Sequence, residues 1–387
     1  MLTTLAVSNY RSLRDLIVPL ERLNVITGPN GSGKSSVYRA LRLLAETAQG
    51  GFINSLAREG GLQSTLWAGP ESISRSVKRG DHPIQGVRRK EPVHLRLGFA
   101  GDELGYAVDV GLPKPSLSAF AHDPEIKSES IWNGPILRPA SLLVERKDWV
   151  VKTRDSGGEW LVLSHNLSTF DSMMTQAVDP RNAPEMLILR EQIRLWRFYD
   201  HFRTDVDAPA RSPRIGTHTP ILTNDGGDMA AALQTIREIG DSEALEHAID
   251  DAFPGSTVSV SSNEGRFEIE MKQHGLLRPL KAAELSDGTI RYLLLIAALL
   301  TPRPPALLVL NEPETSLHPD LLPALGKLIA NAAERSQILV VTHASRLIES
   351  LEKHANCNSI VLEKEFGETK IAGVGRFEAP PWRWPSR

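Results

Sequence analysis

The chain contains almost no cysteine: Cys357 is the only one among its 387 residues. A single thiol cannot form an internal disulfide, and no group of Cys and His residues has the spacing of a structural zinc site. We therefore expect a fold that depends on its hydrophobic core alone, in a protein that works in the reducing cytoplasm.

Long apolar runs are also missing. No stretch of about 18 uncharged apolar residues occurs, and the longest candidate, Tyr292 to Leu300, is too short to span a bilayer. The first residues lack the basic start and the apolar run of a signal peptide. We expect no direct insertion into a membrane, so any membrane partner would be a separate protein.

The chain has no large excess of charge of either sign. Its formal net charge is -3, which excludes a general attraction of the whole molecule to nucleic acid. Binding to DNA would need a local basic patch. Hydrophobic residues make up 41% of the chain and charged residues 24%, an ordinary globular composition that excludes global disorder.

A glycine-rich segment from Gly28 to Ser35 has the pattern G-x-x-x-x-G-K-[ST], with an apolar strand before it and a helix after it. In this pattern, backbone N–H groups turn toward phosphate oxygens, the lysine reaches the β- and γ-phosphates, and the serine hydroxyl is a Mg²⁺ ligand. The sequence therefore predicts a site for ATP and Mg²⁺. The residues expected to bind the nucleotide here are Gly28, Pro29, Asn30, Gly31, Ser32, Gly33, Lys34, Ser35 and Ser36.

A second motif is the apolar strand Leu307 to Leu310, which ends in Asn311 and Glu312. It resembles the Walker B strand of ABC-type ATPases, in which an Asp is usual and the next Glu activates water. Glu312 fits the role of general base. Asn311 departs from the pattern: its amide can hold Mg²⁺ through a water molecule, but it removes one negative charge from the metal site.

A third motif, Glu284 to Thr289, comes shortly before this strand and starts an apolar helix. By itself it would be only a helix N-cap. Its position relative to the other motifs makes it resemble the ABC signature, with Asp287 where Gly is more common. That resemblance implies that Ser286 and Gly288 contact the γ-phosphate held by a second copy of the chain.

Other residues complete the set. Thr315 to Pro319 resembles the D-loop of ABC ATPases, and His343 resembles their switch histidine, a residue that could bond the γ-phosphate. With Glu312 and Lys34, His343 makes up the predicted catalytic group. We take Gln63 as the candidate for the glutamine that contacts the metal, and Arg11 as a further nucleotide-binding residue.

Together with Asn9 to Leu13, these motifs resemble stand-alone RecF/SMC-type ATPases of bacteria over most of the chain. That group shares the Asn-Glu-Pro form of Walker B and the string from Trp196 to Arg203. We interpret this aromatic string as core packing rather than as a surface for stacking bases. The resemblance implies a homodimer that closes around ATP, with DNA or a nuclease as partner, in DNA maintenance, repair or phage defence.

The predicted fold is α/β: a P-loop NTPase of ABC/RecF type with a mixed central sheet, flanking helices, a small antiparallel sheet and an inserted helical subdomain. We expect residues 1–112 and 256–387 to form the ATPase core, and 113–255 to be a largely helical insertion with hairpins. Two alternating runs joined by residues 101–103 predict a hairpin over residues 93–111, and a second possible hairpin turns at residues 156–158. Residues 113–145 are rich in Pro, Ser and charge and are expected to be irregular. Residues 185–202 are expected to be one helix and residues 228–253 two more.

Two functional classes remain open from the sequence. One is an ATP-hydrolysing enzyme that acts on DNA or on a partner nuclease. The other is a slow, nucleotide-responsive switch or binding module that regulates a partner protein. A transport ATPase fits the helical insertion less well. Overcoming-lysogenization nucleases share this ATPase and add a nuclease domain, but only about 40 residues follow His343 here, too few for such a domain.

Overall fold

The computed structural model of the protein describes residues 1–70, 94–114, 117–155, 157–375 and 379–386. The chain divides into two compact units. The first unit comprises Met1–Leu20, Gly28–Arg194 and Ile360–Arg387, and the second unit comprises Glu21–Thr27 and Leu195–Ser359. Each unit thus combines segments that lie far apart in the sequence.

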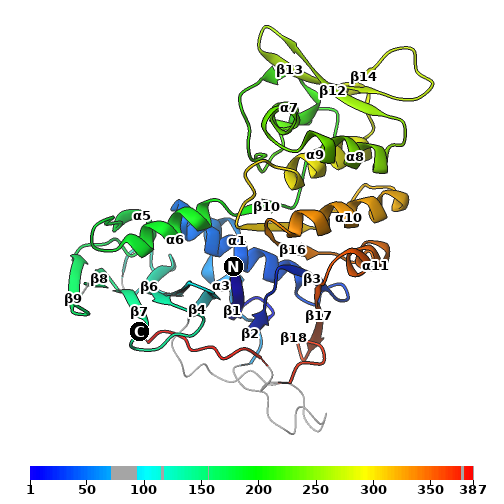
Figure 1. Ribbon diagram of the computed structural model, residues 1–387. Helices are drawn as coiled ribbons and strands as arrows, with labels where there is room; N and C mark the ends of the chain where they lie inside the picture. The colour runs from blue at the N-terminus through cyan, green and yellow to red at the C-terminus, as the bar shows by residue number, and fades with distance from the viewer. Residues whose placement is uncertain (71–93, 115–116, 156, 376–378, 387) are drawn as a thin grey trace. The chain divides into compact units, whose positions relative to one another are not determined.

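The first unit is built on an eight-stranded antiparallel sheet with the order β2-β1-β4-β5-β6-β7-β8-β9 (Figure 1). After the first pair, the strands follow one another as a meander. Their bounds are β1 Leu2–Tyr10, β2 Leu13–Pro19, β4 Leu95–Gly101, β5 Leu104–Gly111, β6 Glu125–Asn133, β7 Leu142–Lys147, β8 Val150–Arg154 and β9 Trp160–Ser164. The expected hairpin around residues 101–104 is confirmed, as is the one around residues 155–159; Val93 and Ser156 lie outside the described residues.

Helices pack on one face of this sheet, with α1, α5 and α6 lying together in Figure 1. The helices of the first unit are α1 Lys34–Gln49, α2 Phe52–Arg58, α3 Gly61–Thr65, α5 Met173–Gln176 and α6 Pro184–Arg194, and a hairpin of β17 Asn358–Glu365 and β18 Glu368–Ile371 completes it. A separate cluster joins Trp132 of β6 to Trp382 and Trp384 near the C-terminus. Gly98 leaves room for the Trp382 ring, which would lie 2.8 Å from an added Cβ.

The expectation of irregular structure over residues 113–145 is wrong for residues 125–133, which form β6. Within the insertion, expected to be largely helical with hairpins, residues 142–164 contain strands β7 to β9. The polar content of β6 has a structural reason. Glu129 is fully buried and accepts bonds from Tyr106, Ser172 and the backbone of Met173, and its carboxylate pairs with the equally buried Arg146 at 2.8 Å. A buried charge needs such partners, so a polar strand can lie in the interior.

The second unit contains four parallel strands in the order β10-β15-β16-β3. Their bounds are β10 Arg197–Tyr199, β15 Leu307–Asn311, β16 Gln337–Val341 and β3 Leu23–Thr27. The register aligns Tyr199, Leu310, Val340 and Val25 in one row across the sheet. All four strands therefore end at the same edge, the edge at which parallel α/β sheets bind their ligands.

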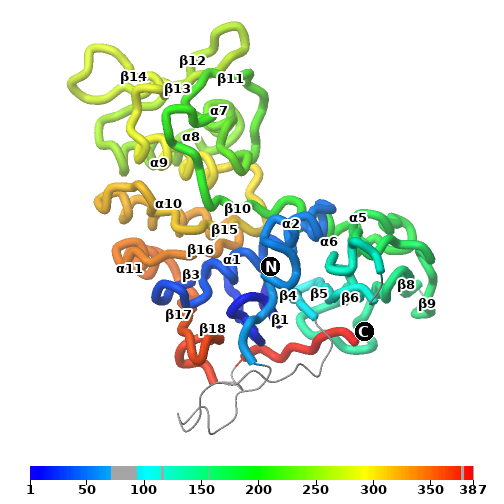
Figure 2. The backbone as a smooth tube through the Cα atoms, turned by 180° about the vertical axis from the view of Figure 1, so that it is seen from behind, coloured from blue at the N-terminus to red at the C-terminus, as the bar shows by residue number. Residues whose placement is uncertain are grey.

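A smaller antiparallel sheet packs against α7 and α8 in the same unit, as Figure 2 shows from behind. The remaining elements of the second unit are β11 Arg214–Ile215, α7 Met229–Ile239, α8 Ser242–Ala252, β12 Thr257–Asn263, β13 Arg266–Lys272, β14 Leu280–Lys281, α9 Asp287–Leu299, α10 Leu322–Ala333 and α11 Ser345–His354, with short 3₁₀ turns at Pro209–Arg211, Ala282–Glu284 and Pro319–Leu321. The two helices expected between residues 228 and 253 are confirmed.

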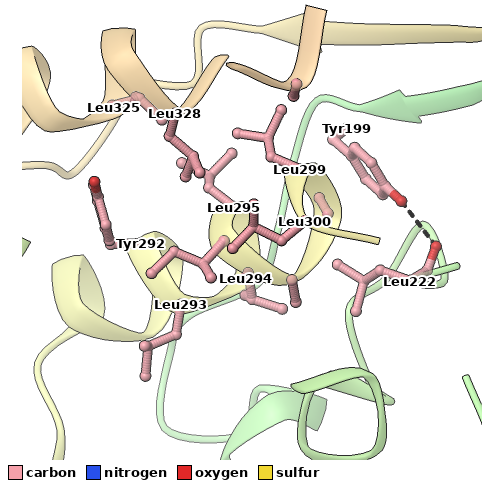
Figure 3. Packing of buried hydrophobic residues seen from close by; sticks show 14 of the residues in the cluster. Tyr199, Leu222, Tyr292, Leu293, Leu294, Leu295, Leu299, Leu300, Leu325 and Leu328 are labelled. Atoms are coloured by element: carbon pink, nitrogen blue, oxygen red, sulfur yellow. Dashed lines mark hydrogen bonds between the residues drawn. The ribbon is translucent and has the colours of Figure 1, made fainter. Parts of the chain in front are cut away.

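Helix α9 is the centre of this unit. Its residues from Thr289 to Leu299 are all buried, as expected for a helix that is covered on every side. Figure 3 shows its leucines packed among Leu325 and Leu328 of α10, with Tyr199 and Leu222 on the other side. Because α9 also starts with the signature motif, its rigidity fixes the position of that motif within the unit.

The expected helix over residues 185–202 is wrong beyond Arg194, where α6 ends. Residues 197–199 instead form β10, because the aromatic side chains of this string fill the interior beside β15: Trp196, Phe198, Tyr199 and Phe202 are all buried. The Tyr199 hydroxyl donates to the Leu222 carbonyl at 2.9 Å. The interpretation of the string as core packing is therefore confirmed.

Among the described residues, no helix has the length and apolar character needed to cross a membrane.

Candidate nucleotide-binding site

The glycine-rich loop of the first unit adopts the conformation that its sequence predicts. Ser32 N–H donates to the Pro29 carbonyl at 3.1 Å, and Gly28, Gly31 and Gly33 have positive φ. The buried Lys34 folds back over the loop, and its Nζ donates to the carbonyls of Gly28 at 2.7 Å and Pro29 at 3.1 Å. The ammonium group is thus held inside the loop, where phosphate oxygens can replace the carbonyls as acceptors.

Helix α1 begins within this loop and presents its positive end there. Gly33 is the N-cap, with no side-chain cap bond, and the first turn contains no acidic residue. The unpaired N–H groups of a helix start and the helix dipole attract anions. The lack of a carboxylate in the first turn leaves these groups available to a phosphate. Ser35 and Ser36 follow in that first turn, and Ser35 is exposed.

The C-terminal hairpin supports the loop from one side. The Thr369 hydroxyl of β18 donates to the Ser32 carbonyl at 2.7 Å and lies 2.8 Å from the Ser12 hydroxyl. An added Cβ at Gly28 would lie 2.2 Å from the Leu362 carbonyl oxygen, and one at Gly33 would lie 2.2 Å from Thr369 Oγ1. Sequence reasoning missed this support, since its residues follow the loop by more than 300 positions and have no motif of their own.

Gly33→Ala should destabilise the nucleotide-free protein more than Gly31→Ala does. Both glycines have positive φ, but an added Cβ at Gly31 meets no atom within 4 Å, whereas one at Gly33 overlaps the buried Thr369 side chain. We expect about 1 kcal/mol of backbone strain at Gly31 and roughly 2–3 kcal/mol in total at Gly33. Thermal unfolding of the two variants without nucleotide measures the difference, and equal melting temperatures would contradict the proposed contact.

Arg11 contacts the end of α3, the helix that contains Gln63. Arg11 N–H donates to the Thr65 carbonyl at 2.7 Å, at the end of α3, and Gln63 is an exposed residue of that helix. The Arg11 guanidinium forms an ion pair with Glu59 at 2.7 Å, and Glu59 also accepts from the Tyr10 hydroxyl. In this structure Arg11 is therefore engaged by a carboxylate. Nucleotide contacts of Arg11 and Gln63 stay predictions.

The strand ends of the second unit bring the other predicted residues together. Asn311 is the last residue of β15, and its Oδ1 is buried with no hydrogen-bond partner among the described residues. Glu312 follows with a positive φ of 48, and its side chain is 45% exposed. His343 follows β16 by two residues, and its Nδ1 lies 3.9 Å from Glu312 Oε1. The candidate base and the candidate switch histidine are therefore neighbours.

The signature motif starts α9 in the same unit. Ser286 is exposed and caps the helix, since its Oγ accepts from Thr289 N–H at 3.1 Å. An added Cβ at Gly288 would lie 2.9 Å from the carbonyl oxygen of Ser316, so the signature and the D-loop-like segment are in contact. The capping role that the sequence alone suggested is present, and the exposed Ser286 hydroxyl remains accessible to a ligand.

Arg211 holds the signature loop in place, a role that sequence reasoning missed. It is buried and donates to the carbonyls of Ala282 and Leu285 at 3.0 and 2.7 Å, and it pairs with Asp287 at 2.7 Å. This pairing accounts for Asp287, which stands where the common pattern has glycine. An arginine and an aspartate 76 positions apart give no local signal in the sequence.

Two further polar residues follow β10 at the same edge of the parallel sheet. Tyr199 is level with Leu310, so Asp200 and His201 follow their strand where Asn311 and Glu312 end the next one. The sequence prediction missed this placement, because it assigned residues 185–202 to one helix and therefore expected no strand to end before residue 200. The position makes Asp200 and His201 candidates for the same chemistry.

The predicted magnesium ligands, Ser35 and Asn311, suit a metal ion that is bound mainly by phosphate and water. Among the described residues, no three His, Cys, Asp or Glu side chains are arranged to hold a metal ion without a ligand. Mg²⁺ commonly takes one or two protein oxygens together with phosphates and water. The Ser35 hydroxyl and the unpartnered Asn311 Oδ1 are groups of that kind. Each of these oxygens, taken within its own unit, therefore suits a metal that arrives with a nucleotide.

Comparison with known families identifies the domain. Residues 23–349 match the model of the family described as "AAA domain, putative AbiEii toxin, Type IV TA system". The chain belongs to this family. It is thus an AAA ATPase domain of the RecF/SMC-like, ABC-type branch, and the resemblance inferred from the motifs is confirmed.

Curated relatives of this AAA domain match over short segments. The OLD nuclease of Thermus scotoductus is 48% identical over 44 residues, which are 11% of this chain and 8% of that protein. The DNA replication and repair protein RecF of Idiomarina loihiensis is 32% identical over 108 residues, 28% of each chain. The matches thus span under a third of either relative.

The fold of the AAA domain is shared with an SMC head. A solved structure of the SmcHead bound to the C-winged helix domain of ScpA covers 98% of this chain and 99% of its own, with a TM-score of 0.50 and 14% sequence identity. The predicted fold class, a P-loop ATPase of ABC/RecF type with mixed α/β architecture, is confirmed. Its antiparallel sheet is larger than expected, because β6 to β9 extend it.

Proposed function

We propose that this AAA domain binds ATP with Mg²⁺ and hydrolyses it. The observation that best supports this proposal is the common edge of the parallel sheet in the second unit. There β15 ends at Asn311, Glu312 follows it, and β16 leads into His343. Strand β3 ends at the same edge, and the phosphate-binding loop starts with the next residue of the chain, Gly28. The chain connection from β3 to the loop is what supports a joint role for the loop, the candidate base and the candidate switch.

The chemistry follows from the residue types. Lys34 and the N–H groups at the start of α1 would hold the phosphates; the Ser35 hydroxyl would hold Mg²⁺ directly, and Asn311 would hold it through a water molecule. Bound Mg²⁺ would neutralise charge on the phosphate oxygens. Glu312, exposed at the strand end, orients the attacking water and accepts its proton. His343 contacts the γ-phosphate through an imidazole N–H.

We further propose that two copies close around ATP. Ser286 and Gly288 lie at the start of α9, where a helix N-terminus favours an anion, and Ser286 is exposed. Light scattering should give the mass of a monomer without nucleotide and of a dimer with ATP and Mg²⁺. A monomer at saturating ATP, in a protein shown to bind it, would contradict the dimer and leave ATP binding intact.

DNA or a nuclease is the proposed partner, since RecF is named for DNA replication and repair and OLD is named as a nuclease. The net charge of -3 means that DNA binding depends on a local basic surface and therefore weakens with salt. ATPase rates with and without duplex and single-stranded DNA test this. A rate that no DNA alters favours the second candidate, a slow switch that regulates a partner protein.

The observation that favours a slow switch is Asn311, which stands where ABC-type ATPases usually have Asp. The variant Asn311→Asp tests whether this residue slows hydrolysis. The new carboxylate would bond Mg²⁺ more strongly than the amide does, because a charge-assisted bond is roughly twice as strong as a neutral one. We expect a lower magnesium requirement and a several-fold faster hydrolysis, with Glu312 still required. Without metal, the buried new charge should lower the melting temperature.

Magnesium titrations of the ATPase rate measure this difference. Asn311→Ala is the matched control, since it removes the amide without adding charge and should raise the magnesium requirement. Superimposable curves for the parent protein and Asn311→Asp would mean that another acidic group already completes the metal site, and would contradict a slowing role for Asn311.

A further inference from the structure

Glu314 is a buried carboxylate to which no motif assigns a role. It follows β15 by three residues, and its side chain is only 7% exposed. Its Oε1 accepts from the Thr342 hydroxyl at 2.6 Å and from the His343 backbone N–H at 3.1 Å. Its Oε2 is buried with no hydrogen-bond partner among the described residues. The carboxylate thus faces the segment that carries the candidate switch histidine.

The segment after β16 is fixed through this carboxylate. Thr342 is fully buried; its N–H donates to the Ile26 carbonyl at 3.1 Å, and its Oγ1 accepts from Ala344 N–H at the start of α11. The Thr342 hydroxyl therefore connects Glu314 to the helix that follows. A buried charge that accepts two bonds in a region of low dielectric makes a strong anchor, and losing it would leave buried donors unpaired.

The imidazole of His343 lies closer to Glu314 than to the candidate base. Its Nδ1 is 3.4 Å from Glu314 Oε1 and 3.9 Å from Glu312 Oε1. The hydrogen bond at one ring nitrogen sets which nitrogen carries the proton. An acceptor at Nδ1 that cannot itself donate favours a proton on Nδ1, which without nucleotide is the Nδ1–H tautomer. To donate to a γ-phosphate oxygen, Nε2 must carry a proton as well, so the imidazole bonds the phosphate as the imidazolium, a form that a carboxylate at Nδ1 stabilises.

Charges around this pair come from several elements. Glu312 precedes Glu314 in the same turn, and Arg291 of α9 is buried and donates to the carbonyls of Glu312 at 3.1 Å and Pro313 at 3.5 Å. Burial lowers the pKa of Arg291, and the charges of Glu314 and Glu312 act in the opposite direction. The Arg291 guanidinium therefore attracts both carboxylates.

We propose that Glu314 is the positioning residue of His343. It holds the histidine backbone at the strand end and takes the Nδ1–H bond, so that Nε2 faces the nucleotide and Glu312 keeps its oxygens for the attacking water. This inference rests on the proposed ATPase function, because it gives His343 and Glu312 their roles. Glu314 acts through His343 and touches no reacting atom.

The first test is the tautomer of His343, which needs no nucleotide. In the full-length protein with ¹⁵N-labelled histidine, His343→Ala assigns the signal by its loss. We expect the Nδ1–H form in the parent protein, a shift toward the Nε2–H form in Glu314→Gln, and a larger shift in Glu314→Ala, since a neutral acceptor is weaker and alanine has none. Glu349→Gln, which removes an exposed carboxylate of α11, should leave the signal unchanged. A signal unaffected by Glu314→Ala overturns the proposal.

The second test separates positioning from binding. In Glu314→Gln, kcat should fall about tenfold while KM stays within about twofold, because one charge-assisted bond is weakened and the phosphate contacts remain. A rise in KM with unchanged kcat overturns the assignment. A parent protein without ATPase activity would refute the proposed function, while the tautomer measurement would still decide the role of Glu314.

A variant pair at Thr342 covers the case in which Glu314 variants do not fold. Thr342→Val keeps the shape but removes the hydroxyl that anchors Glu314, and Thr342→Ser keeps the hydroxyl. We expect the valine variant to shift the His343 tautomer in the direction of Glu314→Gln, and the serine variant to match the parent. Identical tautomer signals in both variants would overturn the anchoring step.

Discussion

Lys34→Ala should reduce ATP affinity by on the order of 10²–10⁴-fold. The Nζ of Lys34 lies buried inside the loop and donates to two carbonyls there. Phosphate oxygens would take over these bonds, and a hydrogen bond to a charged group contributes about 1.5–3 kcal/mol. Two such bonds account for the expected loss, since about 1.4 kcal/mol is a factor of ten.

Binding of a fluorescent ATP analogue to the purified protein measures this loss. Lys147→Ala is a matched control, because it removes a half-exposed lysine from β7 of the same unit. The control should bind ATP like the parent protein, and both variants should remain folded. An unchanged affinity in Lys34→Ala would remove the glycine-rich loop as the nucleotide site.

Local patterns were enough to predict the elements around the glycine-rich loop. Helix α1 begins at Lys34, as the motif requires, and the alternating strands β4 and β5 form the expected hairpin. These elements have short-range causes: glycine conformations, helix starts and period-two burial. The sequence therefore identified the loop, the Walker B strand and the signature helix.

The elements that sequence reasoning missed depend on distant partners. Strand β6 looks polar because Glu129 pairs with a buried arginine 17 positions later. Strand β10 looks helical because its aromatic residues continue the period of α6, yet they fill the interior beside β15. Tertiary contacts override local propensity in both cases. The same reason explains why three supporting residues gave no local signal. The motif residues that bond to the side chains of Thr369, Arg211 and Glu314 lie 28 or more positions away in the sequence.

Glu312→Gln should reduce ATP hydrolysis by roughly 10²–10⁴-fold, the range typical for loss of a general base. The amide keeps the size of the side chain but cannot accept the proton of water. Glutamine should tolerate the left-handed backbone at position 312 as well as glutamate does. The backbone N–H of residue 312, which donates to the Val341 carbonyl at 2.8 Å, is unchanged by the substitution. ATP affinity should therefore stay near that of the parent protein, and the ATP-bound dimer should last longer.

Single-turnover hydrolysis and light scattering with ATP measure these two effects in the same variant. Glu349→Gln is the matched control, because it changes an exposed glutamate of α11 that has no assigned role. Turnover at the parent rate in Glu312→Gln would mean that another group takes the proton, and the neighbouring imidazole of His343 would be the next candidate. Loss of ATP binding in this variant would instead make Glu312 part of the binding site. Only the combination of retained binding and lost hydrolysis supports Glu312 as the base.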